Sequence, residues 1–497
     1  MRPTVVFIFL ILLTLGCNTE QADLPPNILL IVSEDNSPDL GCYGNEIVHT
    51  PHLDQLAHSG FRFTNAFTTY SVCSPSRSSI FTGLYPHQNG QIGWATHHYG
   101  LYEGIRVLPN YLKEAGYKSA LLGKIHVNPE RIFNFDFTAI PESNFQKENL
   151  SNYASTAAEF KASAGDNPYF MMINFPDAHL PFQNDVEGLP TVKVDRKKTT
   201  STLPFVGVTT ERLLEETERY YNCMNRLDES IGMLLDSLGD LSNTVVIYLS
   251  DHGAQFSRGK LTNYEGGLKI PFIIHWPDRF PAQDQVREEL ISVIDILPTV
   301  MDIAGMEAPG FLPGKSLIEL LESPEPEWRE YIGADGEGSS PVFYFPRRSI
   351  RNHSFKLIHN IDVGRSDFPA YHAYADPDFG SGTNQDEIDA ATEHIQSAYN
   401  LWKNPPQYEL YDLRSDPWEF NNLSHLPEYQ DTLNAMIAAL EDWRVQTNDP
   451  LLEPEKLARL TSEMDSINNQ YPDHTYRRID GFSWDYLEYL KPDLNRQ

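Results

Sequence analysis

The chain has 497 residues, of which 40% are hydrophobic and 12% aromatic, a composition that is typical of a globular enzyme and excludes a largely disordered chain. This length is sufficient for a large core and for two domains. The formal net charge of −31 argues against nucleic acid as a partner, because two polyanions repel each other.

The first 25 residues have the pattern of an export signal and a tether. Arg2 precedes an apolar run over residues 5–15, which is too short to cross a bilayer and is typical of a signal peptide. Leu13-Thr14-Leu15-Gly16-Cys17 resembles a bacterial lipobox, which predicts a lipoprotein signal peptide over residues 1–16, lipidation of Cys17 and a tether over residues 17–25. Ordinary secretion with cleavage at a small residue is the alternative. The lipobox predicts an exported, bacterial-type lipoprotein, held at the membrane by its lipid anchor, in the periplasm or on the outer-membrane surface.

Apolar runs that alternate with helical segments follow along the chain. Four short runs predict buried strands, and two other segments have the apolar spacing of helices. The strands are expected at residues 28–32, 119–122, 169–174 and 244–249, and the helices at residues 108–115 and 211–238. This alternation predicts an α/β fold with a mostly parallel sheet flanked by helices on both faces.

Titratable side chains follow each of the four predicted strands, at the carboxyl end of the strand. The pairs are Glu34/Asp35, Lys124/His126, Asp177/His179 and Asp251/His252. The carboxyl ends of parallel strands share one edge of an open sheet, where ligands bind. We therefore expect these side chains to meet in one site.

The pattern changes near residue 340. A β-hairpin is expected at residues 348–351 and 355–358, a further strand at residues 407–413, and a helix at residues 433–443. This antiparallel pattern predicts a smaller C-terminal α+β domain over residues 341–497, after a catalytic domain over residues 26–340. The segment 362–382 is rich in Pro, Gly, Asp and aromatic residues, and we expect it to be a long loop near the cleft.

The segment Cys73-Ser74-Pro75-Ser76-Arg77, followed by Thr82-Gly83, carries the most specific chemical signal. Pro75 suits the first residue of a helix, so Cys73 would lie at a helix N-terminus, where free N–H groups and the helix dipole favour an anion. Arg77 lies one turn further on and can reach the same place. The C-x-P-S-R pattern resembles the type I sulfatases, whose cysteine, here Cys73, is oxidised to formylglycine by a maturation enzyme.

This resemblance extends over nearly the whole chain after the tether. The segments that match family motifs are residues 26–35, 123–126 (G-K-x-H), 250–253 (S-D-[NH]-G), 259–267 and 408–423. Within the family, the chain is most similar to members like N-sulfoglucosamine sulfohydrolase (sulfamidase), through residues 87–90, 97–98, 128–130, 135–137, 348–350 and 357–360. The resemblance implies an alkaline-phosphatase-like large mixed sheet, mostly parallel, with a smaller antiparallel sheet in the C-terminal domain.

The resemblance also implies one divalent metal. Glu34, Asp35, Asp251 and His252 occupy the ligand positions of the family, together with residue 73. Carboxylate oxygens suit Ca²⁺, which is our first choice, whereas an imidazole would also tolerate Zn²⁺ or Mn²⁺. Glu34 stands where the family usually has Asp, and His252 where many members have Asn. The resemblance further implies that Asp251 deprotonates or orients the hydroxyl group that attacks sulfur.

Five side chains are implied in the chemistry of sulfate transfer. Arg77, Lys124 and Lys260 would neutralise the sulfuryl oxygens. His179, with Lys260, would protonate the leaving oxygen or nitrogen. His126 would remove the proton of the remaining hydroxyl group of the sulfated diol, so that the aldehyde reforms and sulfate leaves. Lys260 stands where the sulfamidase has Arg, so here the chain is similar to the broader family.

The expected substrate is a sulfated carbohydrate, contacted by His97, His98 and Asp177. The predicted function is hydrolysis of sulfate esters or N-sulfate groups of a sulfated glycan, for which the acidic chain needs a locally basic cleft. Two alternatives are a phosphonate or phosphodiester hydrolase of the same superfamily and a non-catalytic glycan-binding lipoprotein. Cys42 and Cys223 could form a disulfide or remain two free thiols.

Overall fold

The computed structural model describes residues 25–140, 144–281, 284–362, 364–365 and 367–492. The predicted signal peptide, the lipidation site Cys17 and all of the tether except residue 25 lie outside the described residues. Within the described part, no helix is both long enough and apolar enough to cross a membrane. Cys42, Cys73 and Cys223 are all free thiols, so the alternative of a Cys42–Cys223 disulfide is not realised.

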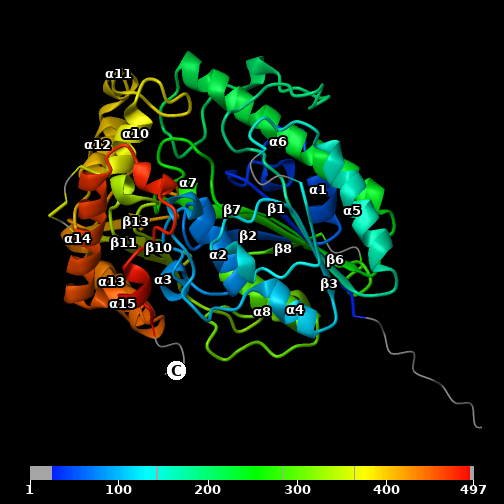
Figure 1. Cartoon of the computed structure of the whole chain (residues 1–497). Helices are drawn as coiled ribbons and strands as arrows, with labels where there is room; N and C mark the ends of the chain where they lie inside the picture. The colour runs from blue at the N-terminus through cyan, green and yellow to red at the C-terminus, as the bar shows by residue number, and fades with distance from the viewer. Residues whose placement is uncertain (1–24, 141–143, 282–283, 363, 366, 493–497) are drawn as a thin grey trace, which may run out of the picture.

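A large mixed sheet forms the centre of the molecule (Figure 1), with the strand order β4-β3-β5-β1-β6-β7-β2-β8 and with β9 beside β2. The central strands β3, β5, β1 and β6 are parallel, and β7 is antiparallel to both of its neighbours. The strands are β1 Asn27–Ser33, β2 Phe61–Phe67, β3 Lys118–Gly123, β4 Phe137–Ala139, β5 Tyr169–Asn174, β6 Thr244–Ser250, β7 Lys269–His275, β8 Gln285–Arg287 and β9 Ile291–Ser292. All four strands predicted from the apolar runs are confirmed.

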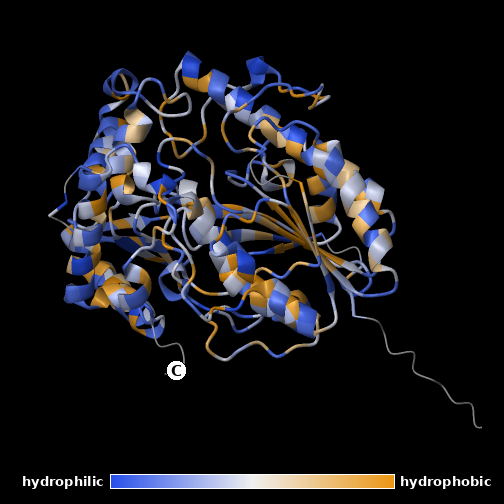
Figure 2. Cartoon of the chain, in the orientation of Figure 1, coloured by the Kyte–Doolittle hydropathy of each residue, from blue (hydrophilic) through white to orange (hydrophobic). Residues whose placement is uncertain are grey.

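Helices cover both faces of this sheet, because its strands are apolar on both sides (Figure 2). Along β1, Leu29 and Ile31 point into one buried cluster, and Ile28, Leu30 and Val32 point into the other. One face is covered by α1 Pro51–His58, α5 Ser151–Ala164 and α6 Glu211–Leu238, and the other by α2 Cys73–Thr82, α4 Leu108–Glu114 and α8 Ile296–Ile303. The doubly covered α/β fold is therefore as predicted, and so are the helices at residues 108–115 and 211–238.

A second, antiparallel sheet has the order β10-β11-β12-β13. Its strands are β10 Ile332–Gly336, β11 Arg347–Arg351, β12 Phe355–Asn360 and β13 Tyr408–Asp412, and α13 Gln430–Gln446 packs on it. The predicted hairpin, strand and helix are confirmed. The predicted boundary at residue 341 is too late for this sheet, because β10 precedes it. In the β10 sequence Ile-Gly-Ala-Asp-Gly, only Ile332 and Ala334 form the apolar side of an alternation, which is too short to be recognised as a strand.

The segment 362–382 lies at the pocket described below, as predicted, but it is not a continuous loop. It contains α10 Pro369–Ala375, which begins at a proline. Proline is common in loops but is also favourable in the first turn of a helix, so the proline content alone did not distinguish the two. The remaining helices include α3 Pro86–Asn89, α7 Glu265–Leu268, α9 Ile318–Glu322, α11 Gln385–Asp389, α12 Glu393–Lys403, α14 Pro454–Gln470 and α15 Tyr486–Tyr489.

The C-terminal segment returns to the large-sheet part of the molecule (Figure 1). Tyr476, Trp484 and Tyr486 pack in one buried cluster with Ile92 and Tyr99, which belong to a loop near the start of α2. Residues far apart in the chain thus build one wall beside α2.

Candidate active site

Cys73 is the first residue of α2, and all side chains of this helix are buried. Val72 has an extended backbone before it, with φ −144° and ψ 141°. The helix therefore starts two residues earlier than the start predicted at Pro75, and Cys73 still lies at the N-terminus, where unpaired N–H groups favour an anion.

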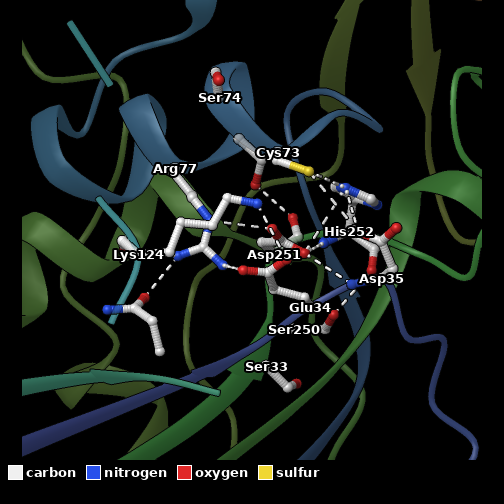
Figure 3. A network of polar contacts seen from close by, with 12 residues as sticks. Ser33, Glu34, Asp35, Cys73, Ser74, Arg77, Lys124, Ser250, Asp251 and His252 are labelled. Atoms are coloured by element: carbon white, nitrogen blue, oxygen red, sulfur yellow. Dashed lines mark hydrogen bonds and ion pairs between the residues drawn. The ribbon is translucent and has the colours of Figure 1, made fainter. Parts of the chain in front are cut away.

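Two neighbouring parallel strands carry acidic residues to Cys73. Ser33 at the end of β1 pairs with Ser250 at the end of β6, so the residues that follow both strands leave the sheet at the same edge. The backbone N–H of Asp35 donates to Oδ1 of Asp251 at 3.1 Å. As Figure 3 shows, Asp251 lies between Arg77 on one side and His252 with Asp35 on the other.

Asp35, Cys73, Asp251 and His252 form a buried cluster that fits a metal ion, because their ligand atoms all lie within 4.8 Å of one another. Nε2 of His252 is 3.2 Å from the Cys73 sulfur and 3.2 Å from Oδ1 of Asp35. The opposite nitrogen, Nδ1, is 2.9 Å from the carbonyl oxygen of Gly253. Donation to that carbonyl fixes the tautomer in which Nε2 is free to bind a cation.

The charges in this cluster favour a cation at its centre. Although burial disfavours an imidazolium, the carboxylates of Asp251 and Asp35 raise the pKa of His252 to about 9. Two buried carboxylates that face each other are costly without a positive charge between them. The donor set of two carboxylates and an imidazole therefore fits a divalent metal.

Glu34 is held differently from the other predicted metal ligands. Its two oxygens are 3.4 Å from Nη2 of Arg77 and 3.0 Å from Nζ of Lys124. It is not part of the cluster around Cys73, although it forms a second possible ligand group with Asp35 and His179. The glutamate thus neutralises two cations in this structure.

Arg77 is fully buried and is surrounded by acceptors. Its Nε is 3.1 Å from Oδ2 of Asp251, and its Nη1 donates to Oδ1 of Asn174 at 2.6 Å. It does not line the pocket, so it holds the carboxylates in place beside Cys73. Asn174, the last residue of β5, was not identified from the sequence because an amide at a strand end is common.

A pocket of about 580 Å³ opens over Cys73. The pocket-lining residues that the sequence identified are Cys73, His97, Lys124, His126, His179 and Lys260. Those that it did not identify are Trp94, Thr96, Phe145, Gln255, Leu261, Phe343, Ala373, Tyr374, Phe379 and Arg477. Of the described residues that line the pocket, none is Asp or Glu. The locally basic lining that an anionic substrate requires is therefore present in a chain with a net charge of −31.

Lys260 joins the pocket to the acidic cluster. Its Nζ is 2.7 Å from Oδ2 of Asp35 and 3.6 Å from the Cys73 sulfur. Burial alone would lower the pKa of Lys260, but the Asp35 carboxylate outweighs it and raises that pKa, so Lys260 is a cation.

Two histidines in the pocket are neutral for the same physical reason. Burial lowers the pKa of His126 and that of His179 below their ordinary value. Lys124 and Lys260 lower both pKa values further, whereas the Asp35 carboxylate acts in the opposite direction on His179. Nδ1 of His126 is buried and has no hydrogen-bond partner among the described residues, whereas Nδ1 of His179 lies 2.7 Å from the carbonyl oxygen of Leu180. A neutral His126 is in the form that accepts a proton.

The predicted substrate-binding residues are placed in three different ways. Asp177 does not line the pocket, because its carboxylate forms a buried double hydrogen bond with Arg226 at 2.8 and 2.7 Å. His98 does not line it either, and its Nε2 is 3.1 Å from the carbonyl oxygen of Arg477. Only His97 is at the pocket wall, with Nδ1 bonded to the hydroxyl of Tyr476. Strand-end position and a His-His pair were insufficient to predict these contacts.

Two protein-family models match the parts of the chain that build most of this site. The model of the sulfatase family matches residues 26–306, and the model of the C-terminal part of N-sulphoglucosamine sulphohydrolase matches residues 255–379. The matches include Cys73, both acidic strand ends, Lys260 and Tyr374, and they stop before Arg477.

Three similar proteins illustrate the range of relatives. The chain is 30% identical to human N-sulphoglucosamine sulphohydrolase in an alignment 461 positions long that covers 86% of this chain and 91% of that protein. It is 32% identical to an ulvan-active sulfatase of Formosa agariphila in an alignment 441 positions long that covers 86% of this chain and 82% of the relative. A protein solved in complex with its substrate, D-glucosamine-2-N,6-O-disulfate, has the same fold, with a TM-score of 0.63, 19% identity and coverage of 86% of this chain and 98% of the other. The chain thus belongs to the sulfatase family and is a sulfuric ester hydrolase.

Proposed function

We propose that this protein removes sulfate, as an ester or as an N-sulfate group, from a glucosamine-containing sulfated glycan. The observation that carries this proposal is the position of Cys73 at the N-terminus of α2, on a basic pocket and beside a metal-binding cluster. The choice of sugar is supported by the similarity to human N-sulphoglucosamine sulphohydrolase and by the neighbour solved with D-glucosamine-2-N,6-O-disulfate.

We further propose that residue 73 acts as formylglycine, made by a maturation enzyme, and that Asp35, Asp251 and His252 hold one Ca²⁺ with it. When bound, the ion would polarise a sulfate oxygen and favour the ionised form of the hydrated aldehyde. Arg77 keeps the carboxylates oriented, and Lys124 and Lys260 offer the substrate sulfate two cations.

The first half of the proposed reaction transfers sulfate to residue 73. One hydroxyl group of the hydrated aldehyde gives up its proton, for which Asp251 is the proposed base, and its oxygen forms a bond to sulfur as the bond from sulfur to the sugar oxygen or nitrogen breaks. The leaving atom takes a proton from His179, with Lys260 beside it. Burial lowers the pKa of His179, and the negative charge of a bound sulfate acts in the opposite direction.

The second half releases sulfate without an attack of water on sulfur. His126 accepts the proton of the second hydroxyl group, the carbon–oxygen bond to sulfate breaks, and the aldehyde reforms. The neutral state of His126 and its unpartnered Nδ1 suit this role.

The test is sulfate release by protein made in a host with the maturation system. Glucosamine N-sulfate, glucosamine 6-sulfate and a phosphonate monoester are offered in parallel, with Cys73→Ala as the blank. We expect release from at least one sulfated sugar and a much lower rate with the phosphonate. Faster phosphonate cleavage would favour the alternative hydrolase, and binding without turnover of any substrate would favour a glycan-binding lipoprotein.

Export and lipid attachment through Cys17 are part of the proposal and have a separate test. Cells are labelled with a radioactive or alkyne fatty acid, and the protein is isolated from membranes. The label is expected on the wild type and not on Cys17→Ala, and an equal label on both would contradict the anchor.

A further inference from the structure

Arg477 is a cation at the wall of the pocket that the proposed reaction does not use. It belongs to the short helix Thr475–Arg478, near the end of the chain and beyond the residues matched by either family model. Within the described part of the chain, no carboxylate lies within ion-pair distance of its guanidinium, which makes one hydrogen bond, from Nε to the carbonyl oxygen of Thr96 at 3.1 Å. Its two terminal nitrogens are therefore available to a ligand.

The arginine is held in place by the loop that carries His97 and His98. Nε2 of His98 is 3.1 Å from the backbone carbonyl oxygen of Arg477. The neighbouring Tyr476 is fully buried, and its hydroxyl contacts Nδ1 of His97. Nε1 of Trp484 donates to the carbonyl oxygen of His97 at 2.9 Å. The two histidines predicted to bind substrate thus act as positioning residues for this wall.

Arg477 is the charged group of this wall. Burial lowers the pKa of His97 to about 3, and the Arg477 cation contributes in the same direction, so His97 is neutral at physiological pH. The other two cations that line the pocket, Lys124 and Lys260, bond to the carboxylates of Glu34 and Asp35 beside Cys73. The pocket therefore has one cationic end around Cys73 and a separate cation on Arg477.

Aromatic side chains line the pocket together with these cations. Trp94 stacks at a tilt on His97, with ring centroids 5.3 Å apart, and its edge meets Phe343 at 5.9 Å. Flat apolar surfaces of this kind pack against the faces of sugar rings, and polar groups fix the orientation of the ring. A sugar can thus lie between the sulfate end of the pocket and Arg477.

We propose that Arg477 is a specificity-determining residue that binds a second anionic group of the substrate while the sulfate to be removed lies at Cys73. This inference rests on the proposed function and deepens it. A planar guanidinium with two free nitrogens matches the paired oxygens of either a sulfate or a carboxylate. The substrate is then a sugar with two negative charges, either a disulfated glucosamine or a sulfated glucosamine joined to a uronic acid.

The test compares Arg477→Gln with Arg478→Gln. Arg478 is adjacent and does not line the pocket, and both arginines are exposed, so the two variants lose the same charge and differ in their position relative to the pocket. The substrates are a singly sulfated glucosamine, its disulfated form, and a sulfated glucosamine–glucuronic acid disaccharide with its carboxyl-reduced counterpart. Arg477→Gln is expected to raise KM about 10-fold for the doubly charged sugar that it recognises and less than about twofold for singly charged sugars. Arg478→Gln should leave every KM unchanged.

The two doubly charged substrates distinguish a sulfate from a carboxylate as the second group. An equal effect of Arg477→Gln on singly and doubly charged sugars, or no effect on either, would overturn the inference.

A binding measurement keeps the inference testable without turnover. Disulfated glucosamine, the sulfated glucosamine–glucuronic acid disaccharide and a singly sulfated glucosamine are titrated calorimetrically into Cys73→Ala, which prevents turnover, and into Cys73→Ala with Arg477→Gln. Affinity for one of the doubly charged sugars that depends on Arg477, beside an unchanged affinity for the singly sulfated sugar, would support the inference even if no sulfate release is found, which would overturn the proposed function alone. Affinity that does not depend on Arg477 would overturn the inference whatever the activity.

Discussion

Two buried clusters of charged residues occupy different parts of the molecule and differ in how their charges are satisfied. The catalytic cluster comprises Glu34, Asp35, Arg77, Lys124, Asp251, His252 and Lys260. The second-sheet cluster comprises His87, Asp335, Glu337, Arg348, Arg444 and Asp449. Both are almost completely buried, so burial alone does not distinguish them.

In the second-sheet cluster, most charged groups are paired closely with one another, although Oε2 of Glu337 and Nη2 of Arg444 have no hydrogen-bond partner among the described residues. Arg348 donates to both oxygens of Asp449 at 3.0 and 2.9 Å, and Nδ1 of His87 is 2.8 Å from Asp335. In the catalytic cluster, by contrast, Asp35 and Asp251 share space with a thiol and an imidazole, and the group opens to a pocket. Acceptors that converge on one point and are accessible from a pocket indicate a functional site, whereas matched pairs indicate a structural role.

The largest expected effect is that of Cys73→Ala on activity. We expect sulfate release to fall roughly 10⁴-fold or more, because no other group can replace the nucleophile, while the free energy of unfolding changes little. Cys223→Ala is the matched control, since Cys223 is also a buried free thiol but does not line the pocket. Equal losses in both variants would mean that Cys73 has a structural role only.

The next largest effect is expected from removal of the metal, which should depend on the catalytic cluster and not on the second-sheet cluster. Dialysis against a chelator is expected to abolish activity, and added Ca²⁺ should restore it and raise the Tm, because an ion that binds the folded state stabilises it. The Tm shift with Ca²⁺ should disappear in Asp251→Asn and persist in Asp335→Asn. A shift that persists in Asp251→Asn would place the ion elsewhere.

Arg348→Met tests the structural role of the second-sheet cluster. Removal of one partner leaves buried carboxylates unpaired, and we expect the free energy of unfolding to fall by about 3–5 kcal/mol. The kcat and KM of the molecules that remain folded should stay within about twofold of the wild type. Denaturant titration and kinetics at low temperature measure the two quantities, and a large change in kcat without loss of stability would contradict the assignment.

The pH dependence of stability should also originate in this cluster. Burial alone would raise the pKa of Asp449, but Arg348 outweighs it and lowers that pKa below the ordinary value of 3.8. The lowered pKa contributes stability that is fully present above about pH 4 and is lost as the pH falls further. Asp449→Asn is therefore expected to be less stable than the wild type by about 2–3 kcal/mol at pH 7. The difference should narrow below pH 4 in denaturant titrations, and a constant difference would refute the pKa shift.

The smallest expected effect is that of Tyr374→Phe. Tyr374 lines the pocket from α10, and its buried hydroxyl has no partner among the described residues. A hydrogen bond to the substrate would satisfy it, so its loss should lower kcat/KM about 10-fold, with no loss of stability. Unchanged kinetics in Tyr374→Phe would show that the substrate does not reach this hydroxyl.

The parts of the molecule that the sequence predicted share a physical cause. A strand covered on both faces must be apolar throughout, and this made residues 28–32 and 244–249 recognisable. Because β1 and β6 are parallel neighbours, the residues that follow them had to meet at one edge of the sheet. Cys73 could be identified because its chemistry requires a specific local pattern.

The parts that the sequence did not predict depend on contacts between distant segments. Arg477 reaches the pocket only because Tyr476 packs against the loop around His97, and no local pattern encodes that contact. Asp177 was misassigned because its strand-end position could not reveal Arg226 of α6 as its partner. Residues of the second-sheet cluster likewise come from several elements that no periodicity connects.

The most direct test of the central claim is peptide mass spectrometry of residue 73 in protein made with the maturation system. Conversion of Cys73 to formylglycine replaces the thiol by an aldehyde and lowers the peptide mass by about 18 Da. The account predicts this loss in the active protein and an unmodified mass at Cys223. A peptide that keeps the thiol at Cys73, in a host that modifies a control sulfatase, would contradict the account.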